Sequence, residues 1–234
     1  MAKRILIVSD DQRNASMRES LAQDGFTVTA ADVENGFRQL LESRFDLVVV
    51  NLSDATKGLG FIKQIRANSE LRDLLILTVA EWGTGQGTMA LTEGVDGFEP
   101  APVDSRRLVT AVASLLRSRL LSGLGLARRA GDLTSGFEKV SAAIDAGKAA
   151  WLIEASDGAA DGRRKLLGKT RKHTPPTPVF GLFTAAELGL ALGGENVIHT
   201  AFLAGRAADR WAEDALRLSG FRPLLPESWR EEPG

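Results

Sequence analysis

Short, unbroken runs of apolar residues are the feature that most limits how this chain can fold. Three of them are RILIV at Arg4–Val8, DLVVV at residues 46–50 and LLILTV at residues 74–79. Each run is four to six residues of mostly branched aliphatic side chains and does not alternate with polar ones. Such runs are typical of strands that are buried on both faces of a parallel sheet. The sequence therefore predicts an α/β fold.

Two further strands are predicted at residues 26–30 and 97–99, and segments with helical apolar spacing separate the five strands. Strand alternating with helix predicts a doubly wound, five-stranded parallel sheet with helices on both faces. Ligands of such sheets bind outside the carboxyl ends of the strands. The residues predicted at that edge are Ser9, Asp10, Asp11, Asn51, Thr78 and Ala101.

Charge is unevenly divided along the 234 residues, although the formal net charge is only -1. Residues 1–118 hold 13 Lys or Arg and 16 Asp or Glu, whereas residues 119–234 hold 16 and 14. The densest basic run is RRKLLGKTRK at residues 163–172. The second half therefore permits nucleic-acid binding, but its charge does not demand it.

The first half carries a resemblance in the stretches KRILIVSDD, DLVVVNLSD, LILT and GVDGFEPAP. Residues 3–118 resemble a response-regulator receiver domain, whose strands have the flavodoxin-like order. The resemblance implies a phosphoryl-accepting Asp after the third strand and two carboxylates after the first strand that hold Mg²⁺. It also implies a Thr or Ser after the fourth strand and a Lys before a Pro after the fifth.

This chain departs from that pattern at the positions that carry out phosphoryl transfer in the family. Asn51 stands at the phosphoacceptor position, and an amide cannot form an acyl phosphate. Ala101 replaces the Lys, and Ser9 takes one of the acidic positions, while Asp10, Asp11 and Thr78 are retained. We expect a pseudo-receiver that makes protein contacts. A bare scaffold, or phosphorylation at another residue such as Ser9 or Ser53, is left open.

A glycine-containing segment begins the second half, at residues 124–139 (LGLARRAGDLTSGFEK). A helical run ends at Ala-Arg-Arg-Ala-Gly, a short extended piece follows, and a new helix opens at Ser135-Gly136. A helix that opens at glycine leaves backbone N–H groups uncovered, and a phosphate can bind there. A glycine at a helix start is by itself more often a tight turn than a ligand site.

The second half also alternates strand and helix, which predicts a smaller α/β/α sandwich over residues 119–222. A tail at residues 223–234 is predicted to be loosely ordered. The stretches LGLARRAG, SGFEKV, AIDAGKAAWLIEASDGA, RRKL and PVFGLFTAAELGLALGGENVIHTAF carry a second resemblance, over roughly residues 120–204. They are similar to the YlxQ-type relatives of the ribosomal-protein family that binds kink-turn RNA, as found at the C-terminus of YlxR-type proteins.

That resemblance implies RNA docking at the helix that opens at Gly136, with a second loop near residues 188–195 meeting unstacked bases. The RNA-binding residues carried over or placed beside this helix are Arg128, Arg129, Gly136, Phe137, Glu138, Lys139, Leu188, Gly189, Leu192 and Gly193. Ala142 stands where the family usually has a Lys, so this chain departs there from the pattern that contacts a kink-turn.

Other classes of function find little support. The chain has no Cys and only two His, which excludes disulfides and makes a zinc site improbable, and we expect no metal and no cofactor. It lacks a phosphate-binding P-loop and a nucleophile elbow, so we expect no enzymatic activity. No apolar run reaches membrane-spanning length, which predicts a cytoplasmic protein without membrane contact.

Together these patterns predict a non-enzymatic, two-domain regulator that binds structured RNA, either ribosomal or kinked. A protein partner is expected at the receiver-like domain. The rival interpretation is a protein-interaction adaptor or signalling scaffold in which neither domain meets RNA. The oligomeric state stays open, a homodimer included.

Overall fold

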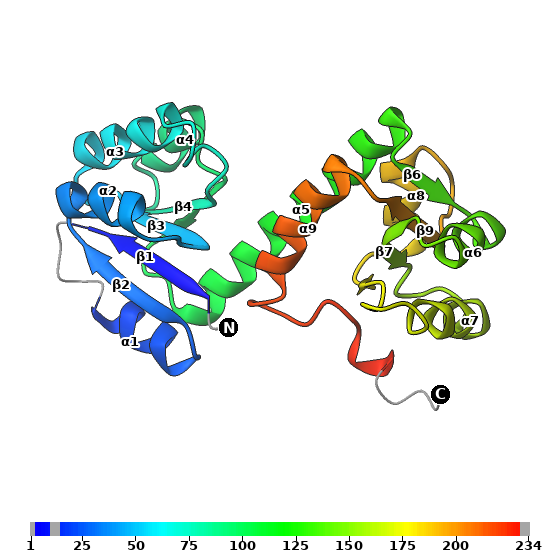
Figure 1. Cartoon of the computed structure of the whole chain (residues 1–234). Coiled ribbons are helices and arrows are strands. Elements are labelled where there is room, and N and C mark those ends of the chain that lie inside the picture. Colours follow the sequence, from blue (N-terminus) through cyan, green and yellow to red (C-terminus); the bar gives the residue numbers. More distant parts are fainter. Residues whose placement is uncertain (1–2, 10–14, 230–234) are drawn as a thin grey trace. The chain divides into compact units, whose positions relative to one another are not determined.

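The computed structural model describes residues 3–9 and 15–229 (Figure 1). The chain divides into two compact units, Met1–Leu115 and Leu116–Gly234. The division lies within one helix, α5 (Ser105–Ala130), three residues before the boundary that the sequence suggested.

A five-stranded parallel sheet forms the first unit. Its strands are β1 (Arg4–Val8), β2 (Thr27–Ala31), β3 (Leu47–Asn51), β4 (Ile76–Ala80) and β5 (Gly97–Pro100), in the order β2-β1-β3-β4-β5. The helices are α1 (Ala15–Gln23), α2 (Val33–Glu42), α3 (Ala55–Ala67), α4 (Gln86–Thr92) and the first part of α5. The predicted doubly wound α/β fold is confirmed.

Alternate residues of each strand supply the two faces of this sheet. Leu6, Val48 and Ile76 pack with Leu40 of α2 and Phe61 of α3 in one core cluster. Figure 1 shows α2, α3 and α4 on one side of the sheet and α1 on the other. The Ser20 hydroxyl donates to that of Ser105, 2.7 Å away, and so joins α1 to α5.

A mixed four-stranded sheet forms the second unit. Its strands are β6 (Leu133–Ser135), β7 (Ala149–Glu154), β8 (Val179–Phe180) and β9 (His199–Leu203), in the order β6-β9-β7-β8. Strand β9 runs antiparallel to β6 and β7. The helices are α6 (Phe137–Asp145), α7 (Ala160–Thr170), α8 (Ala185–Leu192) and α9 (Arg206–Leu218). The predicted smaller α/β region is therefore present.

The two faces of the second sheet are covered by different helices. Val140 and Ile144 of α6 and Leu166 of α7 pack on Leu152 and Ala201. On the other face, the Trp211 ring of α9 packs against Trp151, Phe180 and Phe202, with ring centroids 5.2–5.3 Å apart. The Trp211 indole N–H donates to the Leu120 carbonyl at 3.0 Å, which fixes α9 to α5.

Helix α5 continues through Gly123 and Gly125 without a break. A Cβ at Gly123 would lie 3.1 Å from the Trp211 ring, and one at Gly125 would lie 3.0 Å from the Ala191 carbonyl oxygen. These glycines therefore permit close packing of α5 against its neighbours and do not end the helix.

By length and mean hydropathy, α5 could cross a membrane, contrary to the expectation from sequence. A core helix of a soluble protein passes the same test, so this is weak evidence of a span. The middle of α5 also pairs its charges with protein. Arg117 and Arg119 form ion pairs with Glu187 and Asp214.

The C-terminal segment is packed, so the prediction of a loosely ordered tail is wrong for residues 223–229. The Gly181 N–H donates to the Leu224 carbonyl at 2.9 Å, beside the end of β8. The Arg163 guanidinium lies 4.5 Å from the centre of the Trp229 ring. Individual contacts fix this segment, and they leave no periodic pattern of apolar residues in the sequence from which its packing could be predicted.

Candidate functional site

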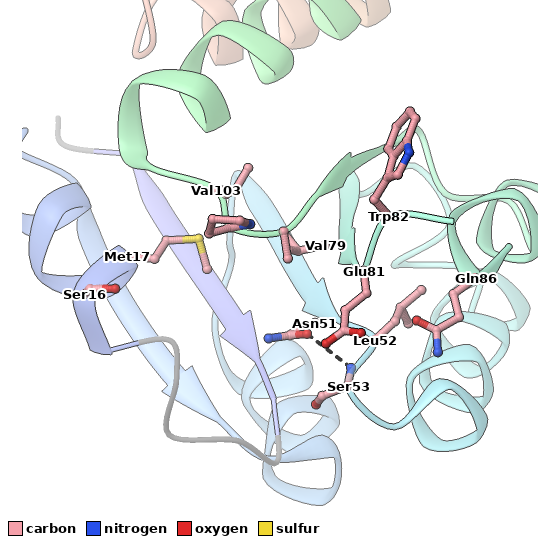
Figure 2. Close-up of a pocket in the computed structure, with 12 residues that line it drawn as sticks. Ser16, Met17, Asn51, Leu52, Ser53, Val79, Glu81, Trp82, Gln86 and Val103 are labelled. Carbon is pink, nitrogen blue, oxygen red and sulfur yellow. Dashed lines mark hydrogen bonds between the residues drawn. The ribbon is translucent and has the colours of Figure 1, made fainter. Parts of the chain in front are cut away.

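A cavity of about 740 Å³ lies at the carboxyl ends of the strands in the first unit (Figure 2). Asn51, the last residue of β3, is half-buried at its wall, and its side-chain oxygen accepts the Ser53 N–H at 3.1 Å. The lining residues are Ser16, Met17, Asn51, Leu52, Ser53, Val79, Glu81, Trp82, Gln86, Ala101, Pro102 and Val103.

The predicted residues of this edge reach the cavity only in part. Asn51 and Ala101 line it. Thr78 is fully buried in β4, where its hydroxyl donates to the Gly97 carbonyl at 3.4 Å, so it lies behind the wall. Ser9 follows β1 and does not line the cavity; its N–H donates to Ala31. Asp10 and Asp11 lie outside the described residues.

Sequence reasoning missed Glu81 and Trp82, which directly follow β4. The strand was expected to end at residue 79, but it continues to Ala80, so the residues that leave the sheet come later. Figure 2 shows Asn51, Ser53 and Glu81 around one hollow, while the Trp82 ring extends away from Asn51. Trp82 is 78% exposed, which is unusual for so large an apolar side chain.

The described residues that line the cavity carry little charge with which to bind a phosphoryl group. Among the described residues that line it, Glu81 alone is ionisable, and no Lys or Arg is present. An acyl phosphate needs a carboxylate to form and a cation to balance its charge. Asn51 and Ala101 provide neither. Within residues 3–9 and 15–229, no group of three His, Cys, Asp or Glu side chains could hold a metal ion.

A second candidate site is the glycine edge, which we define as Gly136–Lys139 together with the loop at residues 193–198. The Gly136 N–H donates to the His199 carbonyl at 2.9 Å, and this bond brings the start of α6 beside the end of that loop. Gly136 has φ 94° and ψ 147° and does not cap α6 with a side chain. In the described part of the chain, the N–H groups of Phe137, Glu138 and Lys139 have no acceptor. These donors suit an anion.

Side chains at the glycine edge differ in how freely they can meet a ligand. Glu138 and Lys139 are exposed. Phe137 is half-buried, and its ring meets the His199 ring edge-on at 5.6 Å, so it packs mainly against the domain. Asp157 accepts the Ala185 N–H, and Glu187 closes a capping box with Thr184. Two of the nearby acids are therefore engaged in capping α8.

Three residues predicted to lie in an RNA-binding loop do not. Leu188, Gly189 and Leu192 belong to α8 and are buried, so the prediction that they form a loop that meets bases was wrong. The backbone at Gly189 packs closely against the chain at Glu195, since a Cβ at Gly189 would lie 2.4 Å from the Glu195 carbonyl oxygen. Only Gly193, the left-handed residue that ends α8, lies in the loop.

Arg128 and Arg129 are also not beside Gly136. They end α5, and the Asp132 carbonyl that follows them accepts the Leu203 N–H, at the far end of the β6–β9 ladder. Gly136 bonds to His199 at the near end. The two arginines and the glycine therefore lie beyond opposite ends of β6, and the extended segment from residue 132 to residue 136 is about 13 Å long.

A buried acid–base pair lies behind the glycine edge. The Glu154 carboxylate and the His199 Nδ1 are 2.7 Å apart, and Glu154 is fully buried. Burial raises the pKa of Glu154 above its ordinary value of 4.5, and the hydrogen bond to His199 opposes this. Within the described residues, the second oxygen of Glu154 has no hydrogen-bond partner. No sequence signal pointed to this pair, since 45 residues separate its members.

No family model matches this chain. PetR from Rhodobacter capsulatus is 28% identical over 116 residues, which are 48% of this chain and 48% of PetR. The transcriptional regulatory protein CpxR from Escherichia coli is 28% identical over 116 residues, 49% of each chain. This chain thus spans about half the length of the curated relatives it matches.

The chemotaxis response regulator CheY4 from Vibrio cholerae is a similar solved structure, 19% identical over 49% of this chain and 99% of CheY4, with a TM-score of 0.45. The strand order β2-β1-β3-β4-β5, all parallel and with helices on both faces, is that of the CheY-like receiver fold. The N-terminal half of this chain has the receiver fold of response regulators.

Proposed function

We propose that this chain is a non-enzymatic, cytoplasmic regulator whose C-terminal half binds structured RNA and whose receiver-like half contacts a protein partner. The observation that carries the RNA proposal is the row of N–H groups at Phe137, Glu138 and Lys139, which have no acceptor among the described residues. Backbone donors at a helix start bind phosphate oxygens without requiring a particular base. The exposed ammonium of Lys139 adds a positive charge to the same place.

The position of the 193–198 loop supports RNA over a protein-only adaptor. This loop leads into His199, whose carbonyl accepts the Gly136 N–H, so the loop borders the open helix start. Ile198 is 36% exposed and packs on Gly158, where a Cβ would lie 2.6 Å from its side chain. An apolar side chain beside phosphate-binding donors suits an unstacked base.

RNA binding by the full chain tests this proposal with charge-reversal variants. Lys139→Glu is the probe, because Gly136 holds a φ/ψ combination that glycine alone adopts without strain. Arg106→Glu is the control, since it reverses an exposed charge in the receiver-like half. The proposal predicts that Lys139→Glu weakens binding of a kinked RNA duplex about tenfold or more, and that Arg106→Glu does not. Equal affinities for the wild type and Lys139→Glu would contradict it.

The receiver-like half is proposed to act through contacts and not through phosphoryl transfer. Asn51 and Ala101, which provide neither a phosphoryl-accepting carboxylate nor a cation, support this, and the exposed Trp82 at the cavity rim offers an apolar contact for a partner. Incubation with acetyl phosphate and Mg²⁺ should leave the mass of the intact chain unchanged. A phosphoryl adduct, on Asp10 or Asp11 for example, would overturn this part of the proposal.

A further inference from the structure

The C-terminal half gathers cationic side chains at the end of its sheet opposite the glycine edge. At this end the Leu203 N–H donates to the Asp132 carbonyl, and the Ala204 N–H donates to the Lys148 carbonyl. The segments that meet here are the C-terminal ends of α5, α6 and α7 and the start of α9. We call this region the basic end, with the exposed residues Arg128, Arg129, Lys148, Arg171, Lys172 and Arg206.

Few acids balance the basic end. Asp145 is held in an ion pair with Lys169, which also joins the end of α6 to the end of α7. Asp132 and Asp209 are the other carboxylates in these segments. In the part of the chain that the structure describes, none of the six basic-end side chains forms an ion pair. The cations are therefore available to solvent and to ligands.

The glycine edge has the opposite balance. Glu138, Asp157, Asp161 and Glu195 are exposed there, and the exposed cations nearby are Lys139, Arg164 and the Asp161-paired Lys165. The glycine edge therefore offers backbone donors but little net positive charge. Backbone donors position a phosphate, whereas the salt-dependent part of nucleic-acid affinity comes from Lys and Arg.

We propose that the basic end is a second RNA-contacting surface, which binds the phosphate backbone of the RNA that the glycine edge docks. This inference rests on the proposed function and assigns the electrostatic part of binding to the end of the sheet opposite the glycine edge. The ends are separated by the length of α6, about 13 Å at 1.5 Å per residue. That distance is within the span of a few nucleotides of a duplex.

Helix chemistry offers a competing explanation for the same side chains. Cations at helix C-termini interact favourably with the helix dipole, and α5, α6 and α7 all end here. If that were their only role, removing them would lower the thermal midpoint of unfolding and leave RNA binding unchanged. RNA contact predicts a change in the salt dependence of binding, which dipole stabilisation does not.

The test compares full-length variants with the same loss of charge. Arg171→Gln with Lys172→Gln and, separately, Arg128→Gln with Arg129→Gln remove pairs from the basic end. Arg44→Gln with Arg106→Gln removes two exposed charges from the receiver-like half. Binding to straight and kinked RNA duplexes is measured by fluorescence anisotropy across a salt series, with thermal unfolding measured on each variant.

Each basic-end pair should reduce the slope of log affinity against log salt by about 2, because each phosphate contact contributes about 1. Over a fourfold rise in salt, the wild type should then lose about 16-fold more affinity than the variant. The control pair should keep the wild-type slope. Unchanged slopes in both basic-end variants, with the wild type still binding, would overturn this inference alone.

Two other outcomes are distinguished by the same measurements. If the wild type binds neither duplex at low salt, the proposed function fails, and this inference fails with it. Vesicles that contain anionic lipid form a further arm. If the basic-end variants lose binding to vesicles but keep the wild-type salt slope on RNA, the surface recognises lipid phosphates and the inference is wrong.

Discussion

The two halves of this chain place different chemistry at the carboxyl ends of their parallel strands. In the receiver-like half that edge is a cavity whose described lining carries Glu81 as its single ionisable group. In the C-terminal half the edge carries open backbone donors, with a buried Glu154–His199 pair behind them. The difference teaches that a shared α/β architecture does not fix function, which depends on the groups that each edge presents.

The largest expected effect contrasts two tryptophans, one in each half. Trp211 is 4% exposed and contacts three other aromatic rings, whereas Trp82 is 78% exposed. Trp211→Ala should lower the free energy of unfolding by about 3–5 kcal/mol. Trp82→Ala should change it by no more than about 0.5 kcal/mol. Chemical denaturation of both variants checks this, and a large loss in Trp82→Ala would show that Trp82 supports the fold.

The buried carboxyl of the C-terminal half should make stability depend on pH. The folded-state pKa of Glu154 lies above its unfolded value of 4.5, so the folded state binds more protons between the two values. Its contribution to stability therefore falls as pH rises through that window and levels off above the folded pKa. Each unit by which the pKa is raised corresponds to about 1.4 kcal/mol.

Glu154→Gln removes that titration and keeps an oxygen that can accept from His199. The free energy of unfolding of Glu154→Gln, relative to the wild type, should therefore increase as pH rises from 4.5. Denaturant titrations at several pH values measure this difference. If the difference in unfolding free energy between Glu154→Gln and the wild type does not change with pH, burial does not raise the pKa of Glu154.

A matched pair of glycines tests how tightly the cavity wall is packed in the receiver-like half. Both lie in α3, but a Cβ at Gly58 would lie 2.5 Å from the side chain of Leu52, and one at Gly60 would meet nothing within 4 Å. Gly58→Ala should destabilise the fold by about 1–3 kcal/mol. Gly60→Ala should stabilise it by about 0.5–1 kcal/mol, since alanine favours the helix. Equal changes in the free energy of unfolding for the two variants would indicate that the Leu52 side chain can move to accommodate a Cβ at Gly58.

Sequence patterns predicted the sheets well because burial on both faces leaves a strong signal. The run at residues 46–50 became β3 (Leu47–Asn51), for example. The error at Leu188 and Leu192 arose because a family motif was mapped onto a stretch whose apolar spacing is that of a buried helix. Asn51 and Ala101 could be placed because strand ends fix them.

Other features could not be predicted, because they depend on contacts between distant residues. Glu154 meets His199 only through the pairing of β7 with β9. The basic end draws on four segments of the chain, which the pairing of β6 and β7 with β9 brings to one end of the sheet. Glu81 and Trp82 were missed because a shift of one residue in a strand end changes which side chains reach the edge.

The central claim is that the C-terminal half binds structured RNA through phosphate contacts, and the salt dependence of wild-type binding tests it most directly. Affinities of the full chain for a kinked and a straight RNA duplex are measured from low to physiological salt. The account predicts binding at low salt that weakens steeply as salt rises, with a linear log–log plot. Absence of binding to either duplex at low salt would contradict it.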